Sequence, residues 1–332
     1  MGRSIFFSEN KPSCGGGTDQ EYLDCIAVVF KEKIEGLGED SFCYAVNENG
    51  TMLGVFDGCG GAGAKEYPAF GNKSGAYMAS RAVAGAARNW FKQTYTRSDA
   101  DTARCAGTLK EAINAALAVC KNNCGASTGA KMKGSLSKAF PTTAAIAICS
   151  GERGRMYADI FWAGDSRVYM LDSSGLAQMT ADDLNGSIDA YENISNDAVL
   201  TNVINASADF TIHSRRVPLN MPCVVFCASD GCFGYIPSPM EFEYMLLNTL
   251  DRAVSVTGWE DLIGSQLAET SGDDYTFVAG VLGFGSFNTL KEHFRFRTEE
   301  LYRDYIEPLG LGVTSTADEL WREYRENYYR FG

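Results

Sequence analysis

The order of short apolar runs along the chain constrains the fold most. Each run consists of β-type residues and is bounded by turn residues, which is typical of strands. Helical patterns interrupt these runs in pairs and do not alternate with them one by one. The expected strands span residues 26–30, 41–46, 52–56, 144–149, 155–162, 167–171, 223–228 and 275–282. We therefore predict the α+β fold class, with mainly antiparallel sheets flanked by helices.

Apolar residues spaced three and four apart predict the helices between these strands. The expected helices span residues 74–95, 108–121, 239–254 and 259–270. Residues 122–140 are expected to form a loop, and the turn residues at 47–50 and 172–175 predict hairpins.

The composition changes near the end of the given sequence. Charged and aromatic residues recur at helical spacing over residues 290–306, and Pro308 and Gly310 are expected to end that helix. Thr316 and Glu319 form a capping-box-like start of a final helix.

Charge and histidine content limit the chemistry. The chain has 332 residues, 42 of them acidic and 29 basic, and only two histidines, His213 and His293. A net charge of −13 argues against a general nucleic-acid binder, which needs a basic surface. Two histidines exclude a multi-histidine zinc site, so metal chemistry would fall to carboxylates, which suit Mg²⁺, Mn²⁺ or Ca²⁺.

The eleven cysteines are scattered, their number is odd, and no CxxC pair occurs. This is typical of reduced thiols in a cytosolic protein, not of a disulfide framework. The first residues lack the apolar core of a secretory signal, and no apolar run approaches the roughly 20 residues of a membrane span. We expect a cytoplasmic protein that does not engage membranes.

A glycine-rich loop follows the strand that ends at Asp57. Gly58, Gly60 and Gly63 fit the G-x-G-x-x-G pattern of dinucleotide sites, but the acidic residue expected about 20 positions later is absent. A methyltransferase loop would need an alternating β/α chain, and a phosphoaspartyl hydrolase would need a second Asp where Cys59 stands. A metal site is the third reading, since tight glycine turns let a carboxylate and a main-chain carbonyl approach one cation. An ordinary Asp-Gly turn has the same sequence.

Other acidic residues occupy comparable positions at the ends of expected strands. Asp165 and Asp230 each follow a β run, Asp273 precedes the last one, and Glu39 and Asp40 precede an early one. Taken singly, each is typical of a turn or a helix cap. Together, in a chain with so few histidines, they suggest carboxylates that converge on two cations, activate a water and neutralise a phosphoryl group.

The motifs form an ordered set. They are Glu39-Asp40, residues 55–61 (Val-Phe-Asp-Gly-Cys-Gly-Gly), 141–144 (Pro-Thr-Thr-Ala), 164–167 (Gly-Asp-Ser-Arg), 179–183 (Met-Thr-Ala-Asp-Asp), 228–231 (Ala-Ser-Asp-Gly) and 273–276 (Asp-Asp-Tyr-Thr). In order and spacing this set resembles the metal-dependent protein serine/threonine phosphatases of type 2C, the PPM family, over residues 20–285. The resemblance implies a four-layer αββα sandwich with a metal centre at one edge. Residues 1–286 would form the catalytic domain, and residues 287–332 a C-terminal helical extension packed on it or used for docking.

The resemblance also implies roles for individual residues. Asp57 matches the aspartate that bridges two Mn²⁺ or Mg²⁺ ions, and Gly58 supplies a main-chain carbonyl. Glu39 matches a ligand of one ion, while Asp230 and Asp273 match ligands of the other.

Two further positions complete the implied centre. Asp165, with Asp230, matches the place of a third, weaker metal in bacterial members, and Asp40 matches a residue near the activated water. By analogy, that water attacks the phosphorus of phosphoserine or phosphothreonine in a protein substrate, with no phosphoenzyme.

The sequence departs from the family pattern in its polar groups. Cys59 stands where the family usually has a histidine that acts as general acid, and Asp274 stands where it usually has Asn. Glu35 takes the place of a phosphate-binding Arg, so Lys33 and Lys31 are the candidate phosphate ligands. Three hypotheses follow: an active phosphoprotein phosphatase, a pseudophosphatase that binds or regulates, and a hydrolase of small phosphorylated metabolites.

Overall fold

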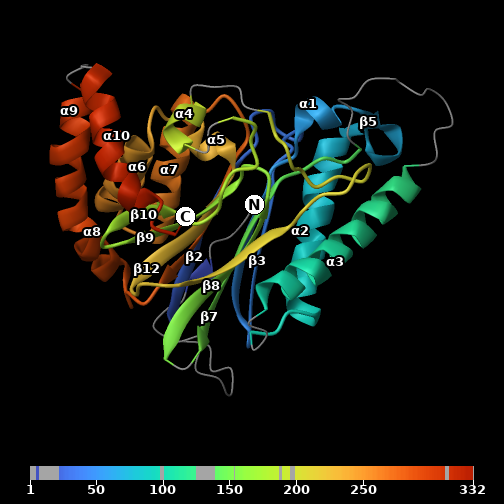
Figure 1. Cartoon of the computed structure of the whole chain (residues 1–332), viewed down its shortest axis with the longest axis horizontal. Helices are drawn as coiled ribbons and strands as arrows, with labels where there is room; N and C mark the ends of the chain where they lie inside the picture. Colours follow the sequence, from blue (N-terminus) through green and yellow to red (C-terminus); the bar gives the residue numbers. More distant parts are fainter. Residues whose placement is uncertain are drawn as a thin grey trace.

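The structure is a computed structural model. It describes residues 5–6, 22–97, 101–124, 139–152, 154–186, 189–194, 199–310 and 314–331. In this part of the chain, two antiparallel sheets lie face to face and helices cover both outer sides (Figure 1). The predicted α+β fold with four layers is therefore confirmed.

The first sheet combines strands from the beginning, the middle and the later part of the chain. Its strand order is β1 (Ile5–Phe6), β2 (Leu23–Lys31), β13 (Tyr275–Leu282), β12 (Cys223–Ala228), β9 (Arg167–Asp172) and β10 (Gly175–Gln178). Every residue of β12 and β13 is buried, because one face meets the second sheet and the other meets helices. Burial on both faces explains why these strands read as continuous apolar runs.

The second sheet is built from the middle of the chain. Its order is β11 (His213–Pro218), β8 (Arg155–Ala163), β7 (Ala144–Glu152), β4 (Gly50–Phe56) and β3 (Ser41–Asn47). The expected hairpin at 47–50 joins β3 to β4, with Asn47 opposite Gly50. A small separate ribbon pairs β5 (Glu66–Tyr67) with β6 (Lys73–Ser74).

Helices α2 (Gly75–Gln93) and α3 (Thr102–Asn123) cover the second sheet. Each begins at a side-chain cap: Ser74 accepts a hydrogen bond from the Tyr77 amide, and Asp101 accepts one from the Arg104 amide. Phe56 and Phe161 of the sheet pack with Trp90 and Phe91 of α2 in this layer.

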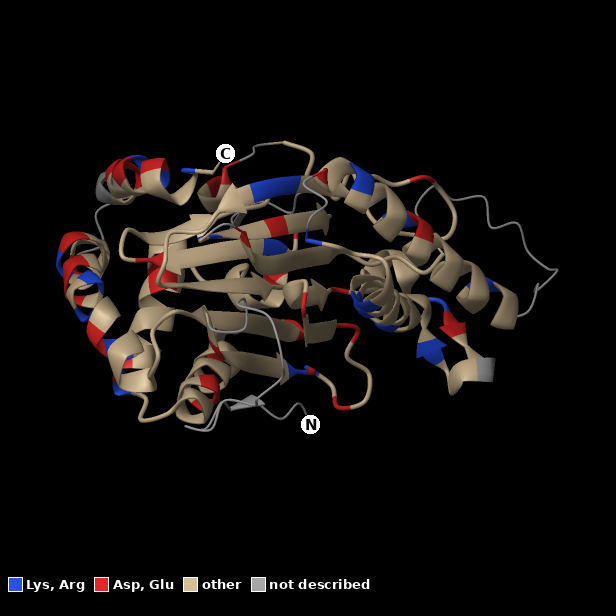
Figure 2. Cartoon of the chain, turned by 90° about the horizontal axis from the view of Figure 1, so that it is seen from below, with Lys and Arg blue, Asp and Glu red and all other residues tan. Residues whose placement is uncertain are grey.

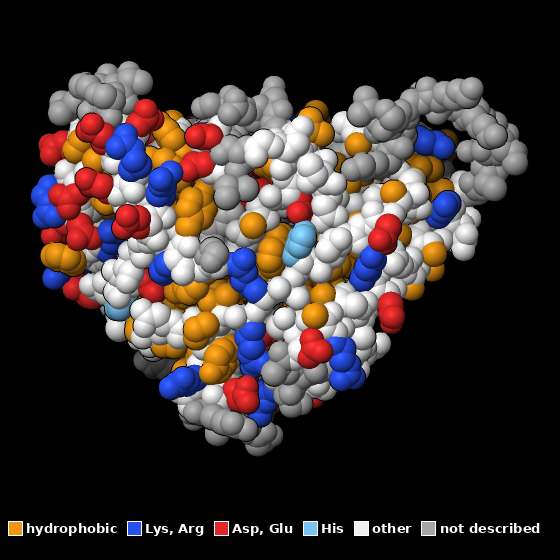
Figure 3. Space-filling model, viewed as in Figure 1, with side chains coloured by type: hydrophobic (Ala, Val, Ile, Leu, Met, Phe, Trp, Pro, Cys, Tyr) orange, Lys and Arg blue, Asp and Glu red, His pale blue; other side chains and the backbone are white. Residues whose placement is uncertain are grey.

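Helices α6 (Pro239–Arg252) and α7 (Val256–Thr270) cover the first sheet. They are joined there by α8 (Phe287–Leu301), α9 (Glu307–Gly310) and α10 (Thr314–Tyr328), on the left in Figure 1. Buried Phe294, Trp321 and Tyr328 share one apolar cluster with the sheet. Outward, these helices carry intermixed acidic and basic side chains (Figure 3). In the described ranges no helix is long and apolar enough to cross a membrane.

The structure differs from the expectations in local details. The hairpin expected at 172–175 is confirmed: it joins β9 to β10, with Asp172 opposite Gly175, although no range was predicted for the short strand β10. Strand β11 was not expected, because it reads His-Ser-Arg-Arg-Val-Pro at a sheet edge. Asn122 and Asn123 belong to α3 and not to the expected loop, whose residues 125–138 lie outside the described ranges.

Pro308 does not end its helix as expected. A π-helical turn over Tyr302–Ile306 precedes it, and the helix continues to Gly310. Proline lacks an N–H and its ring crowds the carbonyl four residues earlier, which a wider π turn relieves. The final helix begins at Thr314, two residues before the expected Thr316.

A buried ion pair ties the C-terminal helices to α6. Glu243 of α6 is fully buried and accepts two hydrogen bonds from Arg297 of α8, at 2.8 and 3.0 Å. Tyr324 of α10 donates its hydroxyl to the same carboxylate at 2.6 Å. The three partners come from three helices, so the contact fixes their packing.

We predict that Arg297→Met lowers the free energy of unfolding by about 3–5 kcal/mol, because it leaves the Glu243 charge buried without a cation. The matched control is Arg295→Met on the same helix, whose pair with Glu292 is exposed and contributes little. Urea unfolding measures both variants. Equal losses would show that the buried pair contributes no more than a surface pair.

Candidate metal centre

The acidic residues lie at one edge of the sandwich because both sheets end there. Asp57 follows β4, Asp165 lies just beyond β8, and Asp230 follows β12. Glu39 and Asp40 precede β3, whose Ser41 pairs with Phe56 next to Asp57. Figure 2, in which acidic positions are red on the ribbon, shows several of them in the turns that join the strands.

The backbone of Asp57 is held by the residues that precede β7. Its carbonyl accepts hydrogen bonds from the Thr143 amide and the Thr142 hydroxyl, each at 2.7 Å. Its amide donates to the Thr143 hydroxyl at 3.3 Å, and that hydroxyl also bonds Ser166 at 2.6 Å. The loop after β4 is thus anchored to the turn after β8, which carries Asp165.

Asp57, Asp165 and Asp230 repel one another at this edge, and Asp40 behind them adds its charge. Burial raises the pKa of Asp57 well above its usual value, and the charges of Asp230, Asp40 and Asp165 raise it further. A side-chain hydrogen bond joins Asp57 to Asp230. Burial, and then Asp230, raises the pKa of Asp165 to about 8. The cluster holds more negative charge than its surroundings balance.

Asp40 is buried behind this cluster. Its carboxylate accepts hydrogen bonds from the hydroxyls of Ser229 at 2.7 Å and Thr276 at 2.6 Å. Burial raises the pKa of Asp40 to about 7, although these two hydrogen bonds lower it. The side chain is therefore fixed in place and close to its titration point at neutral pH.

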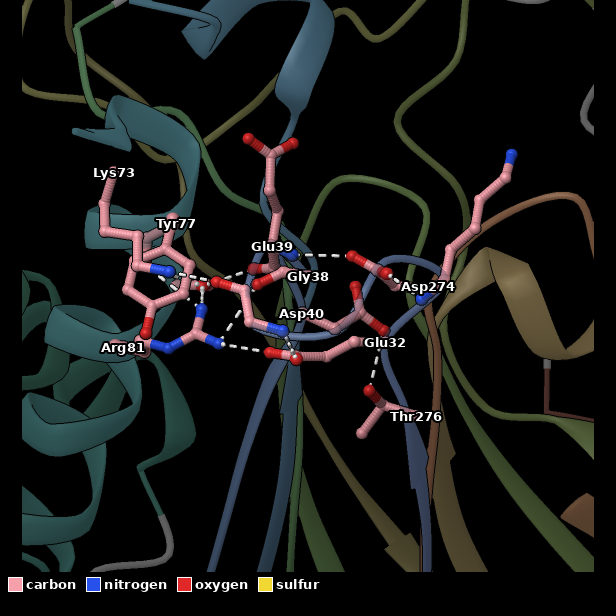
Figure 4. A network of polar contacts seen from close by, with 12 residues as sticks. Glu32, Gly38, Glu39, Asp40, Lys73, Tyr77, Arg81, Asp274 and Thr276 are labelled. Carbon is pink, nitrogen blue, oxygen red and sulfur yellow. Dashed lines mark hydrogen bonds and ion pairs between the residues drawn. The ribbon is translucent and has the colours of Figure 1, made fainter. Parts of the chain in front are cut away.

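Glu39 lies between α2 and the loop before β13 (Figure 4). The Ser74 hydroxyl donates to its carboxylate. Burial raises the pKa of Glu39, and the Asp274 and Asp273 charges add to this, while Ser74 and Arg81 oppose it. Arg81 itself is held by the Gly38 carbonyl at 3.0 Å.

The glycine loop packs closely against Glu39. A Cβ atom on buried Gly58 would lie 2.7 Å from the Glu39 carbonyl oxygen and 2.8 Å from that of Ala76, so a larger residue cannot fit without a shift. Gly60 opens the short helix α1 (Gly60–Gly63), and a Cβ there would collide with the Glu39 carboxylate. Half-buried Cys59 precedes this helix, and its amide donates to the Pro141 carbonyl at 3.2 Å.

The loop before β13 brings Asp273 and Lys33 to the same edge. The Asp274 carboxylate accepts hydrogen bonds from the Lys33 amide at 2.7 Å and from the Glu39 amide at 2.6 Å. Each of its two oxygens serves as one acceptor. The Lys33 ammonium donates to the Gly272 carbonyl, next to exposed Asp273. Lys31 is exposed at the end of β2, opposite Tyr275, and exposed Glu35 lies in the loop that follows.

Sequence reasoning placed Arg167 and Asp182 in motifs of the ordered set but assigned neither of them a role. Arg167 forms a bidentate pair with Asp182, at 3.0 and 2.6 Å, and both charges act on Asp165. Arg167 also bonds the hydroxyl of Tyr328 in α10 at 3.4 Å. Ser74, which bonds Glu39, had no assigned role either, but its local signal was clear, since a serine before an Ala-rich helix is a typical cap.

The residues present fit divalent cations. Within the described part of the chain, Asp57, Asp165 and Asp230 form no ion pair, because Arg167, whose charge acts on Asp165, is paired with Asp182. Oxygen donors of this kind are what Mg²⁺ and Mn²⁺ prefer. Among the residues with described placement, no three His, Cys, Asp or Glu side chains are arranged so that they could hold a metal ion by themselves. Main-chain oxygens such as that of Gly58, together with waters, would therefore share in the coordination.

Comparisons with solved structures support the fold. Staphylococcus aureus serine/threonine phosphatase Stp1 is 19% identical, with a TM-score of 0.60, over 80% of this chain and 96% of Stp1. The catalytic domain of PstP in complex with two manganese ions is 20% identical, with a TM-score of 0.54, over 79% of this chain and 98% of that domain. The phosphatase MsPP from Mycobacterium smegmatis is 14% identical, with a TM-score of 0.54, over 79% and 99%.

No curated protein sequence matches the chain well enough to count as a relative. A family sequence model does match, over residues 35–268, and its description is protein phosphatase 2C. The match covers every acidic strand-end residue of the centre except Asp273. The chain therefore belongs to the protein phosphatase 2C family.

Proposed function

We propose that this chain is a metal-dependent phosphoprotein phosphatase that hydrolyses phosphoserine and phosphothreonine. The observation that carries the proposal is the crowding of Asp57, Asp165 and Asp230 at one sheet edge in a member of this family. Such a cluster of like charges is costly unless cations balance it.

Two Mn²⁺ or Mg²⁺ ions would be held by Glu39, Asp57, the Gly58 carbonyl, Asp230 and Asp273. Asp165, next to Asp230, offers a place for a third ion. The manganese ions in the PstP domain support this choice of cofactor. When bound, such ions activate a water and neutralise phosphoryl charge.

The chain's own groups would supply the rest of the chemistry. The Asp40 carboxylate, fixed by two hydroxyls and titrating near neutral pH, would take up a proton beside the reacting water. The Lys33 ammonium, with Lys31 as a second cation, would attract the phosphoryl group. The Cys59 thiol would donate a proton to the departing alkoxide.

A pseudophosphatase is the alternative function, and Cys59 and Glu35 favour it. A thiol replaces the usual general acid, and a carboxylate replaces the usual phosphate-binding arginine. Loss of general-acid catalysis alone typically slows a reaction by about 10²–10⁴-fold, which leaves metal-driven hydrolysis measurable.

The first prediction tests turnover itself. We expect Mn²⁺-dependent phosphate release from p-nitrophenyl phosphate and from a phosphothreonine peptide, reduced to background by Asp57→Asn, which removes a carboxylate that would hold the ions. Asp24→Asn is the matched control: Asp24 is half-buried, but it lies at the opposite end of β2 and accepts the Phe284 and Gly285 amides. If the unaltered chain releases no more phosphate than Asp57→Asn, the chain is a pseudophosphatase and the proposal of an active enzyme is wrong.

The second prediction concerns Cys59. Cys59→His should preserve or raise kcat/KM on an alkyl phosphate such as phosphoserine, because imidazole is the better proton donor at neutral pH. Phenyl phosphates, whose leaving groups need less protonation, should change least. A large drop on both substrates would instead give the Cys59 thiol a specific role of its own.

The third prediction concerns pH and the metal-free protein. An unfolded aspartate has a pKa near 3.9, whereas the folded protein raises those of Asp40 to about 7 and Asp165 to about 8. Between these values the folded state binds more protons than the unfolded state, so the free energy of unfolding should fall as pH rises from about 5 to 8.5.

Chemical denaturation at several pH values measures this slope. Saturating Mn²⁺ should flatten it, since cations then balance the charge in place of protons, and Asp165→Asn should flatten it in the metal-free protein. A metal-free protein that gains stability over this pH range would contradict the repulsion between these carboxylates.

A further inference from the structure

Tyr235 lies at the outer rim of the carboxylate centre. It follows the short helix α5 (Asp230–Phe233), which begins with a proposed metal ligand, and precedes α6. Its side chain is 45% exposed. Solvent and a bound substrate can therefore reach it.

The tyrosine ring packs on the loop that carries Asp273. A Cβ atom on Gly272 would lie 2.7 Å from Cε1, 3.1 Å from Cζ and 3.2 Å from the hydroxyl oxygen of Tyr235. The phenol end of the ring, not only its edge, thus touches the residue directly before Asp273. A larger residue than glycine would push the ring away.

The hydroxyl also lies within the field of the centre. Burial raises the pKa of Tyr235, and the next contributions come from the charges of Asp273, Asp230 and Asp57. These three are the proposed ligands of one ion. The phenol accordingly stays neutral and protonated, which keeps it a hydrogen-bond donor without adding charge beside the carboxylates.

A second donor meets Tyr235 at the same glycine. The Lys33 ammonium donates to the Gly272 carbonyl, while the Lys33 amide is held by Asp274 at 2.7 Å. A neutral donor and a cation thus flank Gly272, on the exposed rim of a centre that would hold cations. An anionic group that is drawn to those cations would meet both donors.

We propose that the Tyr235 hydroxyl donates a hydrogen bond to the phosphoryl group of the bound substrate. The inference rests on the proposed function, because it assigns a ligand to the same centre. It makes Tyr235 a binding residue for the phosphoryl oxygens and not a proton donor to the leaving group. Binding of the phosphoryl group by Tyr235 breaks and forms no covalent bond.

The test compares Tyr235→Phe, which removes only the hydroxyl, with the unaltered protein. Loss of one hydrogen bond to a charged group should raise KM for p-nitrophenyl phosphate by about 10- to 150-fold with kcat little changed. The inhibition constant of inorganic phosphate should rise by a similar factor. The matched control is Tyr302→Phe, since Tyr302 is also 45% exposed but lies on the C-terminal helices.

Two outcomes would overturn the inference. If Tyr235→Phe behaves as the unaltered protein and only Tyr235→Ala is impaired, the ring supports the Gly272 loop and the hydroxyl binds nothing. If Tyr235→Phe lowers kcat much more on phosphoserine than on p-nitrophenyl phosphate, the hydroxyl serves the leaving group instead.

A binding measurement separates this inference from the proposed function. Calorimetric titration of inorganic phosphate into the Mg²⁺-loaded protein needs no turnover. If the unaltered protein is inactive yet its phosphate affinity falls in Tyr235→Phe, the enzyme proposal fails and the Tyr235 contact stands. If the protein turns over substrate but phosphate affinity is unchanged in Tyr235→Phe, the enzyme proposal stands and the contact fails.

Discussion

Repulsion among carboxylates at a shared sheet edge is the constraint on which the rest of the site depends. Asp57, Asp165 and Asp230 follow strands of two different sheets, and the packing of those sheets brings them together. Their raised pKa values express the cost of this arrangement. Protons can lower that cost, as the Asp57–Asp230 hydrogen bond does, and cations can lower it further.

The surrounding structure holds the charges in place rather than dispersing them. Hydroxyls of Ser229 and Thr276 fix Asp40, and Ser74 fixes Glu39. The charge of Arg167 acts on Asp165 and Asp230, but its guanidinium is hydrogen-bonded to Asp182 and to Tyr328 of the C-terminal helices. The helices beyond residue 286 therefore share a core and a polar contact with the elements that carry the site, although residues 287–332 as a separable unit stay a prediction.

The sequence predicted those parts of the fold that local patterns encode. Buried strands such as β12 and β13 are continuous apolar runs, and α2 carries a recognisable cap. Strand β11 was not predicted, because its two arginines at a sheet edge give the polar pattern of a loop. The helix was predicted to end at Pro308, but a π turn before this proline allows the helix to continue past it. The acidic strand ends were predictable because each follows or precedes an apolar run.

The partners of those acidic residues were not predictable in the same way. Arg81 meets the residue before Glu39 from a helix more than 40 positions away, and Asp274 reaches Lys33 and Glu39 across 241 and 235 positions. Tyr235 carries no motif, and its contact with Gly272, across 37 positions of the chain, is not visible in the sequence. Such contacts arise from packing of the sheets and follow from no local rule.

The most direct test of the central claim is anomalous X-ray diffraction from crystals soaked in Mn²⁺, recorded at the manganese edge. The account predicts strong peaks beside Asp57 and Asp230, with carboxylate oxygens about 2.1 Å from each ion, as is typical of hard octahedral cations. Well-ordered carboxylates with no peak within bonding distance of Asp57 would contradict it.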